Sequence, residues 1–227
     1  MKEAVVAVGT ARKSTKRLTG PERKRQIAEA MLTLANTHGI HGVTTAKIAA
    51  HVGVSESALY MHFENREMML CEAIDVLYER DLAQVSDTSG AENILEHLLR
   101  LSSLFATGSE QAQILRVKLQ LLAGPLSPAL RERVLLGEAK RIDLHIRLAE
   151  QGKAEGSIRP DVDSREFVWD LYYAYSTASN PAIILGLRYD AQTERDDPLV
   201  RLLRTVATDP SSIEGYLDRL MLERAAH

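Results

Sequence analysis

The 227-residue sequence predicts an all-α protein made of a short N-terminal three-helix unit and a larger helical bundle. Apolar residues recur with the three- and four-residue spacing of amphipathic helices over most of the chain, and the alternation typical of strands is absent. Short segments rich in Gly, Pro, Ser and Asp separate the helical stretches. These segments are 86–90, 107–109, 124–128 and 155–164.

The chain begins with an irregular basic segment. Residues 1–20 show no helical period and carry a cluster of Lys and Arg, so we expect a flexible basic arm. The helix that follows opens with a capping-box pair, Thr19 and Glu22, and ends at Gly39. One apolar stripe along this helix contains Ile27, Ala30, Met31, Leu34 and Ala35.

Residues 44–66 predict two short helices joined by a tight turn at Gly53. Either Thr44 or Thr45 caps the first helix, and Ser55 caps the second. The apolar positions that fix the two helices against each other are Ile48, Ala49, Val52, Val54, Leu59 and Phe63. With Leu59 directed inward and roughly 100° of rotation per residue, the outward face consists of Ser57 and Met61, flanked by Tyr60. A DNA major groove can meet such a face.

Charge is divided unevenly between the two parts. Residues 1–66 contain 10 Lys and Arg against 5 Asp and Glu, a net charge of +5, whereas residues 67–227 contain 18 against 26, a net charge of −8. A basic N-terminal unit on an acidic body suggests phosphate contact at one end only, as nucleic-acid binding requires. A solvated charge bias without a partner is the alternative.

Other classes of protein lack support in the sequence. The single cysteine, Cys71, allows no intramolecular disulfide, so we expect a reducing, cytoplasmic location. No apolar run reaches the length of a membrane span, and the run 4–8 is too short for a secretory signal. Zinc signatures, phosphate-binding glycine loops and nucleophile elbows are absent. We therefore expect no enzymatic activity, no cofactor, no metal and no membrane partner.

Three short runs, Gly53-Val54-Ser55, Ala58-Leu59-Tyr60 and His62-Phe63, together with Arg66 resemble the TetR family of bacterial transcriptional regulators. The resemblance covers about residues 21–70. It implies an N-terminal three-helix helix-turn-helix DNA-binding domain at 21–66, followed by a helical-bundle effector-binding and dimerisation domain at 67–227. It also implies a double-stranded DNA operator as partner. The arm at 1–20 either lies along the minor groove, as such extensions can in this family, or stays disordered.

The resemblance also implies which side chains face DNA. Contacts to the phosphate backbone are expected from Thr45, Lys47, Tyr60, His62 and Arg66, while base edges are expected to meet Glu56, Ser57 and Met61, with Ser55 at the start of the same helix. Glu56 departs from the family pattern, which often has a basic or neutral residue there. An acid beside phosphates is repelled unless it accepts from a cytosine amino group, so Glu56 either reads cytosine or points aside.

A helix from Asn65 to about Val85 is expected to link the two parts. At 1.5 Å per residue it spans on the order of 30 Å, so its tilt would reposition the DNA-binding unit. Further helices are predicted from Ala91, around 114–122, and from Ser127-Pro128 to Gln151. Another is predicted from Asp163 or Ser164 to Asn180-Pro181, which bends or ends it. The last two are predicted to start at Pro198 and at Asp209-Pro210.

Candidate effector contacts lie among these body helices. They are His97, Phe105, Arg116, Leu119, His145, Trp169, Tyr172 and Tyr173. Each is either a ligand contact or an ordinary core or edge residue. Because aromatic residues make up only 5% of the chain, we expect a largely aliphatic pocket and an apolar or amphipathic small-molecule effector.

The resemblance implies a homodimer formed by helices near 165–180 and 210–224, and a repressor that is released from a near-palindromic operator by its effector. The alternative is an effector-independent, DNA-bound interaction protein, because the stretch 44–63 also resembles the nucleoid-occlusion branch of the family. A helical enzyme is a third reading, for which the sequence offers no catalytic constellation.

Overall fold

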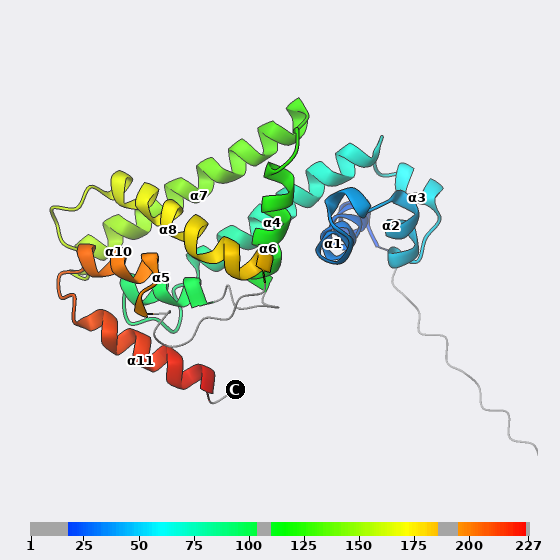
Figure 1. Cartoon of the computed structure of the whole chain (residues 1–227). Coiled ribbons are helices and arrows are strands. Elements are labelled where there is room, and N and C mark those ends of the chain that lie inside the picture. The colour runs from blue at the N-terminus through cyan, green and yellow to red at the C-terminus, as the bar shows by residue number, and fades with distance from the viewer. Residues whose placement is uncertain (1–17, 104–109, 186–194, 226–227) are drawn as a thin grey trace, which may run out of the picture.

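The computed structural model describes residues 18–103, 110–185 and 195–225. Phe105 and residues 1–17 of the expected basic arm therefore lie outside the described residues. The all-α prediction is confirmed: every regular element of the described residues is a helix, and a single isolated bridge joins Ile158 to Ala207. The helices gather in two regions, with α1 (Gly20–His38), α2 (Thr45–Val52) and α3 (Glu56–Tyr60) at one end of the molecule (Figure 1).

The helix α4 (Arg66–Ser86) runs from the small unit into the body (Figure 1). Asn65 caps it through a side-chain oxygen that accepts from Met68 N at 2.9 Å. Its predicted start and its end near Val85 are confirmed. The body contains α5 (Ile94–Ser103), α6 (Glu110–Leu122), α7 (Pro128–Ala154), α8 (Ser164–Leu185), α10 (Pro198–Val206) and α11 (Ser212–Ala225).

Several predicted helix ends differ from the observed ones. The helix expected from Ala91 starts at Ile94, because the Asn93 side chain accepts from Glu96 N at 3.1 Å. The last helix starts at Ser212, two residues after Pro210, because Asp209 Oδ1 first accepts from Ser211 N in a turn. The helix α8 runs through Pro181 to Leu185, so the alternative that Asn180-Pro181 ends it is wrong.

Two apolar clusters hold the fold together. The first joins α1, α2 and α3 to the N-terminal half of α4 and continues into α6 and the start of α7, through Ile114, Val117 and Leu130. The second joins α5, the end of α7, α8, α10 and α11. The N-terminal three-helix unit therefore shares one core with the adjoining part of the body, and α4 contributes to both clusters.

Candidate nucleic-acid interface

The turn between α2 and α3 is built by three local signals. Thr44 caps α2, since its side chain accepts from Lys47 N at 3.2 Å, and this decides between the two predicted caps. Ser55 caps α3 by accepting from Ala58 N at 3.3 Å, as predicted. Gly53 lies between them with φ 76° and ψ 36°, a left-handed conformation that glycine adopts without steric cost. These residues fix the angle between the two helices.

The predicted inward and outward faces are both observed. Ile48 and Leu59 are fully buried, and Phe63 is nearly so. On the opposite side, Ser57 is exposed and Met61 is 83% exposed, which makes it the most exposed large apolar side chain of the described residues. Tyr60 is 49% exposed. The face is therefore open to a partner.

Hydrogen bonds link the polar groups of this face. Thr45 Oγ1 donates to Glu56 Oε2 at 2.6 Å, so the start of α2 is tied to the start of α3. The hydroxyls of Ser55 and Ser57 lie 2.9 Å apart. Lys47 Nζ donates to Gly42 O at 2.9 Å and remains exposed. In this conformation Glu56 points toward α2.

Arg66 and His62 lie beside the face and are half-buried. The Arg66 guanidinium donates from Nε to Val43 O at 2.9 Å and from Nη2 to Ile40 O at 2.7 Å. These bonds join the start of α4 to the segment before α2, which includes the 3₁₀ helix η1 (Ile40–Gly42). This positioning role was missed in the sequence, where Arg66 indicates only a basic charge. Phosphate contacts by Arg66 and His62 remain predictions.

The body contains a group of charged side chains that the sequence did not predict as a unit. Asp81 on α4 is 2% exposed and pairs with Lys118 Nζ at 3.3 Å and with Arg141 Nε at 3.1 Å. Lys118 Nζ also lies 2.7 Å from Glu138 Oε1, and Tyr78 Oη donates to that same oxygen at 2.7 Å. We call these five residues the polar centre. They connect α4, α6 and α7.

Burial and charge act against each other on the acidic groups of the polar centre. Burial alone raises the pKa of Asp81, but the nearby charges of Arg141 and Lys118 outweigh it and the net pKa is lowered. The pKa of Glu138 is lowered as well, since Lys118 and the Tyr78 hydroxyl outweigh its burial. Both carboxylates are therefore ionised and paired at neutral pH.

His145 and Tyr172 adjoin the polar centre. His145 is 2% exposed, and its Nδ1 donates to Arg141 O at 2.8 Å, while its Nε2 has no hydrogen-bond partner among the described residues. Burial and the Arg141 charge lower the pKa of His145 to about 4. The Tyr172 ring packs edge-on against the His145 ring, with centroids 5.9 Å apart, and beneath the Arg141 guanidinium. A neutral histidine is thus held in the core.

The structure brings together only some of the candidate effector contacts. Trp169 stacks edge-on with Tyr172 at 6.1 Å between centroids, but it is 50% exposed, and Tyr173 is 70% exposed on the outside of α8. His97 is buried and donates from Nε2 to Val85 O at 2.8 Å. The other two described candidates, Arg116 and Leu119, are half-buried on α6.

One sequence signal could have revealed the polar centre. Gly137 stands in the middle of the long helix α7, and a Cβ there would lie 2.4 Å from the Tyr78 ring. Glycine inside a helix costs about 1 kcal/mol relative to alanine, so its presence points to a close approach. The neighbouring Glu138 and Arg141 follow at helical spacing and mark the same face of α7.

In the described parts of the chain, no group of three or more His, Cys, Asp or Glu side chains could hold a metal ion. None of the helices there is long and apolar enough to cross a membrane.

The N-terminal geometry is that of a helix-turn-helix on an all-helical body, and a comparison with known protein families identifies this N-terminal unit. Residues 27–73 match the family model "Bacterial regulatory proteins, tetR family". The resemblance inferred from the sequence is therefore confirmed: the chain carries the TetR-family DNA-binding domain at its N-terminus.

Similar proteins extend this picture. The nucleoid occlusion factor SlmA of Shewanella woodyi is 35% identical over 88 residues, which are 37% of this chain and 45% of the relative, so the chain spans less than half the length of the curated relatives it matches. A TetR-family regulator from Cytophaga hutchinsonii has the same fold, with a TM-score of 0.70 at 17% identity over 86% of this chain and 100% of that one. The regulator FadR from Bacillus subtilis, solved with stearoyl-CoA, has a TM-score of 0.61 at 19% identity over 78% and 96%.

Proposed function

We propose that the chain is a transcriptional repressor that binds a near-palindromic operator as a homodimer in the cytoplasm and leaves it when a small-molecule effector binds. The observation that carries this proposal is the open face of Ser57, Tyr60 and Met61 on a TetR-family helix-turn-helix, joined through α4 to a separate helical body. We propose neither enzymatic activity nor a cofactor for it.

The proposed DNA contacts follow from the geometry of the open face. Tyr60, exposed and flanking the face, would donate its hydroxyl to a phosphate, and Lys47 would add a positive charge at the start of α2. Ser57 and Met61 would meet base edges in the major groove. His62 and Arg66 would complete the phosphate contacts from the edge of the unit, with Arg66 already fixed by two backbone carbonyls.

A homodimer is required to place two such faces on one duplex. Exposed Trp169 and Tyr173, one helical turn apart on α8, form an apolar surface that suits a second copy of the chain. This surface supports the expected role of residues 165–180 in forming the homodimer. Support for 210–224 is weaker, because Tyr216 and Leu217 of α11 are buried within the chain and only Leu222 is a large exposed apolar side chain there.

The effector would act through α4. Asp81 anchors this helix to α6 and α7 in the polar centre, while the first half of α4 packs in the core of the DNA-binding unit. An apolar or amphipathic effector that contacts Tyr172 and His145 would shift the helices around Asp81 and so tilt the reading face. A ligand that prefers a conformer whose two reading faces no longer match the spacing of the half-sites weakens DNA binding. The loss equals the difference in its binding free energy between that conformer and the DNA-binding one, typically about 1–3 kcal/mol.

The proposal is tested by selecting bound sequences from random duplex DNA with the full-length protein at a stated salt concentration, because phosphate-driven affinity depends steeply on salt. The expected result is a near-palindrome with half-sites about 34–36 Å, one helical turn, apart. An enriched motif without two-fold symmetry would contradict the dimer, and the absence of any enriched motif would contradict specific regulation.

The similarity to SlmA favours a second candidate function, an effector-independent protein that binds DNA and recruits a protein partner. The two functions differ in the distribution of their chromosomal sites. Mapping of bound sites in cells of the source organism would show few sites beside regulated genes for a repressor, and many dispersed sites for the alternative. Release of DNA by a small molecule would favour the repressor.

A further inference from the structure

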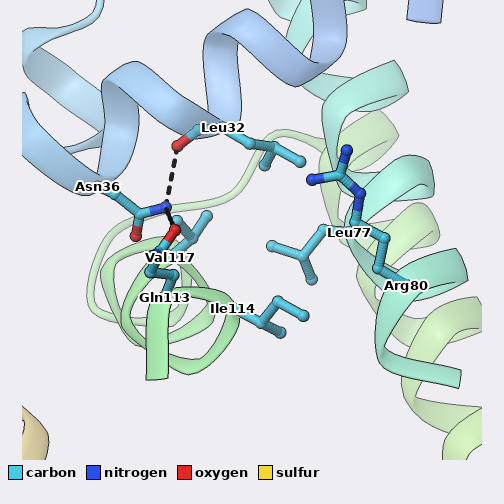
Figure 2. Close-up of a pocket in the computed structure, with 7 residues that line it drawn as sticks. All are labelled: Leu32, Asn36, Leu77, Arg80, Gln113, Ile114 and Val117. Atoms are coloured by element: carbon cyan, nitrogen blue, oxygen red, sulfur yellow. Dashed lines mark hydrogen bonds between the residues drawn. The ribbon is translucent and has the colours of Figure 1, made fainter. Parts of the chain in front are cut away.

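A pocket of about 210 Å³ lies where the DNA-binding unit meets the body, between α1, α4 and α6. Its apolar walls are Leu32, Leu77, Ile114 and Val117, and Figure 2 shows Leu32, Leu77 and Ile114 converging on it from three different helices. These side chains are buried, with Leu77 and Val117 only 1% exposed, so a molecule held between them would lose its water. None of the predicted effector contacts that the structure describes lines this pocket.

Polar groups stand at two sides of the pocket. At one side, Asn36 Nδ2 donates to Leu32 O at 3.2 Å and to Gln113 Oε1 at 3.4 Å, which links α1 to α6. Arg80 stands across from them and reaches toward α1 (Figure 2). Its Nη2 donates to Glu29 Oε1 at 2.9 Å, and the other guanidinium donors have no hydrogen-bond partner among the described residues.

We propose that this pocket binds a small monocarboxylate whose apolar part is a single ring or a short alkyl chain. An engineered cavity of about 150 Å³ in another protein holds benzene, so a ring with one short substituent fits the volume observed here. The four apolar walls suit that ring or chain. The planar fork of Arg80 suits a carboxylate, which accepts two parallel N–H donors from arginine.

The location couples such a ligand to DNA binding. Two hydrogen bonds join the DNA-binding unit to α6. The first is the one from Asn36 to Gln113, and the second runs from Ile40 N to Gln120 Oε1 at 2.8 Å. A ligand wedged between Leu32 and Ile114 would hold α1 at a fixed distance from α6, and with it the whole helix-turn-helix, which shares its core with α1. We expect bound carboxylate to weaken DNA binding by about 5- to 150-fold. Only this consequence depends on the proposed function.

The test uses the full-length protein with 13C-labelled Ile, Leu and Val methyl groups. Benzoate, phenylacetate, hexanoate and octanoate are titrated into the millimolar range, each beside its neutral amide. The expected result is a saturable shift of the Leu32, Ile114 and Val117 methyl signals by at least one acid, with no shift at Leu199 in the second apolar cluster. The amide should bind about tenfold more weakly, because it lacks the charge that Arg80 recognises.

Two variants separate ligand recognition from a structural role of Arg80. Arg80→Gln and Glu29→Gln each remove the same Arg80–Glu29 ion pair, but only the first removes the proposed carboxylate contact. We expect Arg80→Gln to lose the preference for acid over amide, and Glu29→Gln to bind the acid as well as the parent protein or better. Equal binding by Arg80→Gln, or the absence of methyl shifts with all four acids, would overturn the proposal.

DNA binding is measured on the same samples by fluorescence anisotropy with the selected duplex. If the protein binds the carboxylate but no duplex, the proposed ligand pocket stands and the proposed function is refuted. A protein that binds the duplex with unchanged affinity in saturating carboxylate would retain the proposed function and refute the coupling.

Discussion

The DNA-facing surface and the polar centre are both rich in polar side chains, yet their charged groups lie in opposite environments. Lys47 and Glu56 on the surface are exposed and make only local hydrogen bonds, so water and salt screen them. In the polar centre, Asp81 is almost fully buried and has two positively charged partners within 3.3 Å. Surface charges stay available to a partner, whereas those of the polar centre fix three helices relative to one another.

This contrast predicts a large difference in stability when one charge is removed. Asp81→Asn leaves Lys118 and Arg141 buried without their shared carboxylate, and breaking a buried pair costs about 3–5 kcal/mol. The matched control is Asp75→Asn, also on α4, which breaks the exposed Asp75–Arg133 pair and should cost at most about 1 kcal/mol. Urea denaturation measures both free energies of unfolding. Equal losses for the two variants would contradict the contrast.

The buried histidine predicts a dependence of stability on pH. Because the pKa of His145 falls from an ordinary 6.5 to about 4 on folding, the unfolded chain binds more protons between these values. Stability is therefore intact above pH 6.5 and declines as pH falls toward 4, by about 1.4 kcal/mol per unit at most.

Urea denaturation of the parent protein and of His145→Gln at a series of pH values measures this decline. The variant should lack much of it, and what remains should come partly from His97, whose pKa is also lowered by burial. A parallel decline in both proteins would show that His145 does not cause it.

The two regions also differ in how far the sequence revealed them. The helix-turn-helix depends on local signals, namely the cap residues Thr44 and Ser55 and the turn at Gly53, and these can be recognised within a dozen residues. Tertiary packing then only confirms what the spacing of Ile48 and Leu59 predicts.

The polar centre could not be predicted in this way, because its members are distant in the sequence. Asp81, Lys118 and Glu138 lie on three different helices, and in the sequence each looks like an ordinary solvent-exposed polar residue at the edge of a helix. The sequence also does not show in which direction a side chain points. The sequence shows that Arg66 is basic, but only the structure shows that two of its donors are directed at backbone carbonyls. To predict the pocket at α1, α4 and α6, one would need both the contacts between residues distant in the sequence and the directions of their side chains.

On the surface, the largest expected effect is on DNA affinity. Tyr60→Phe should weaken binding to every sequence about tenfold, because one hydrogen bond to a charged phosphate is worth about 1.5 kcal/mol. Stability should not change, since the ring is 49% exposed and its hydroxyl has no partner among the described residues. Urea denaturation of the same variant is the control and should give the free energy of unfolding of the parent protein. Effects confined to particular base positions would refute a phosphate contact.

The smallest effect expected concerns Glu56, whose carboxylate accepts from Thr45 at the first turn of α2. The free N–H groups of a helix start attract anions, so this carboxylate occupies a place that a DNA phosphate would otherwise favour. Glu56→Gln should therefore raise affinity for unrelated duplexes by roughly threefold, a weak effect because the site is exposed and screened. Glu64→Gln, an exposed acid just beyond α3, should change affinity less.

The same variant decides between the two readings of Glu56. If the carboxylate stays on Thr45 when DNA binds, sequence selection with Glu56→Gln should return the parent motif, with only the background of unrelated sequences increased. If Glu56 instead leaves Thr45 to accept from a cytosine amino group, the variant should lose its preference at one base position in each half-site. The hydrogen bond at 2.6 Å leads us to expect the first result, since a base contact would have to replace it.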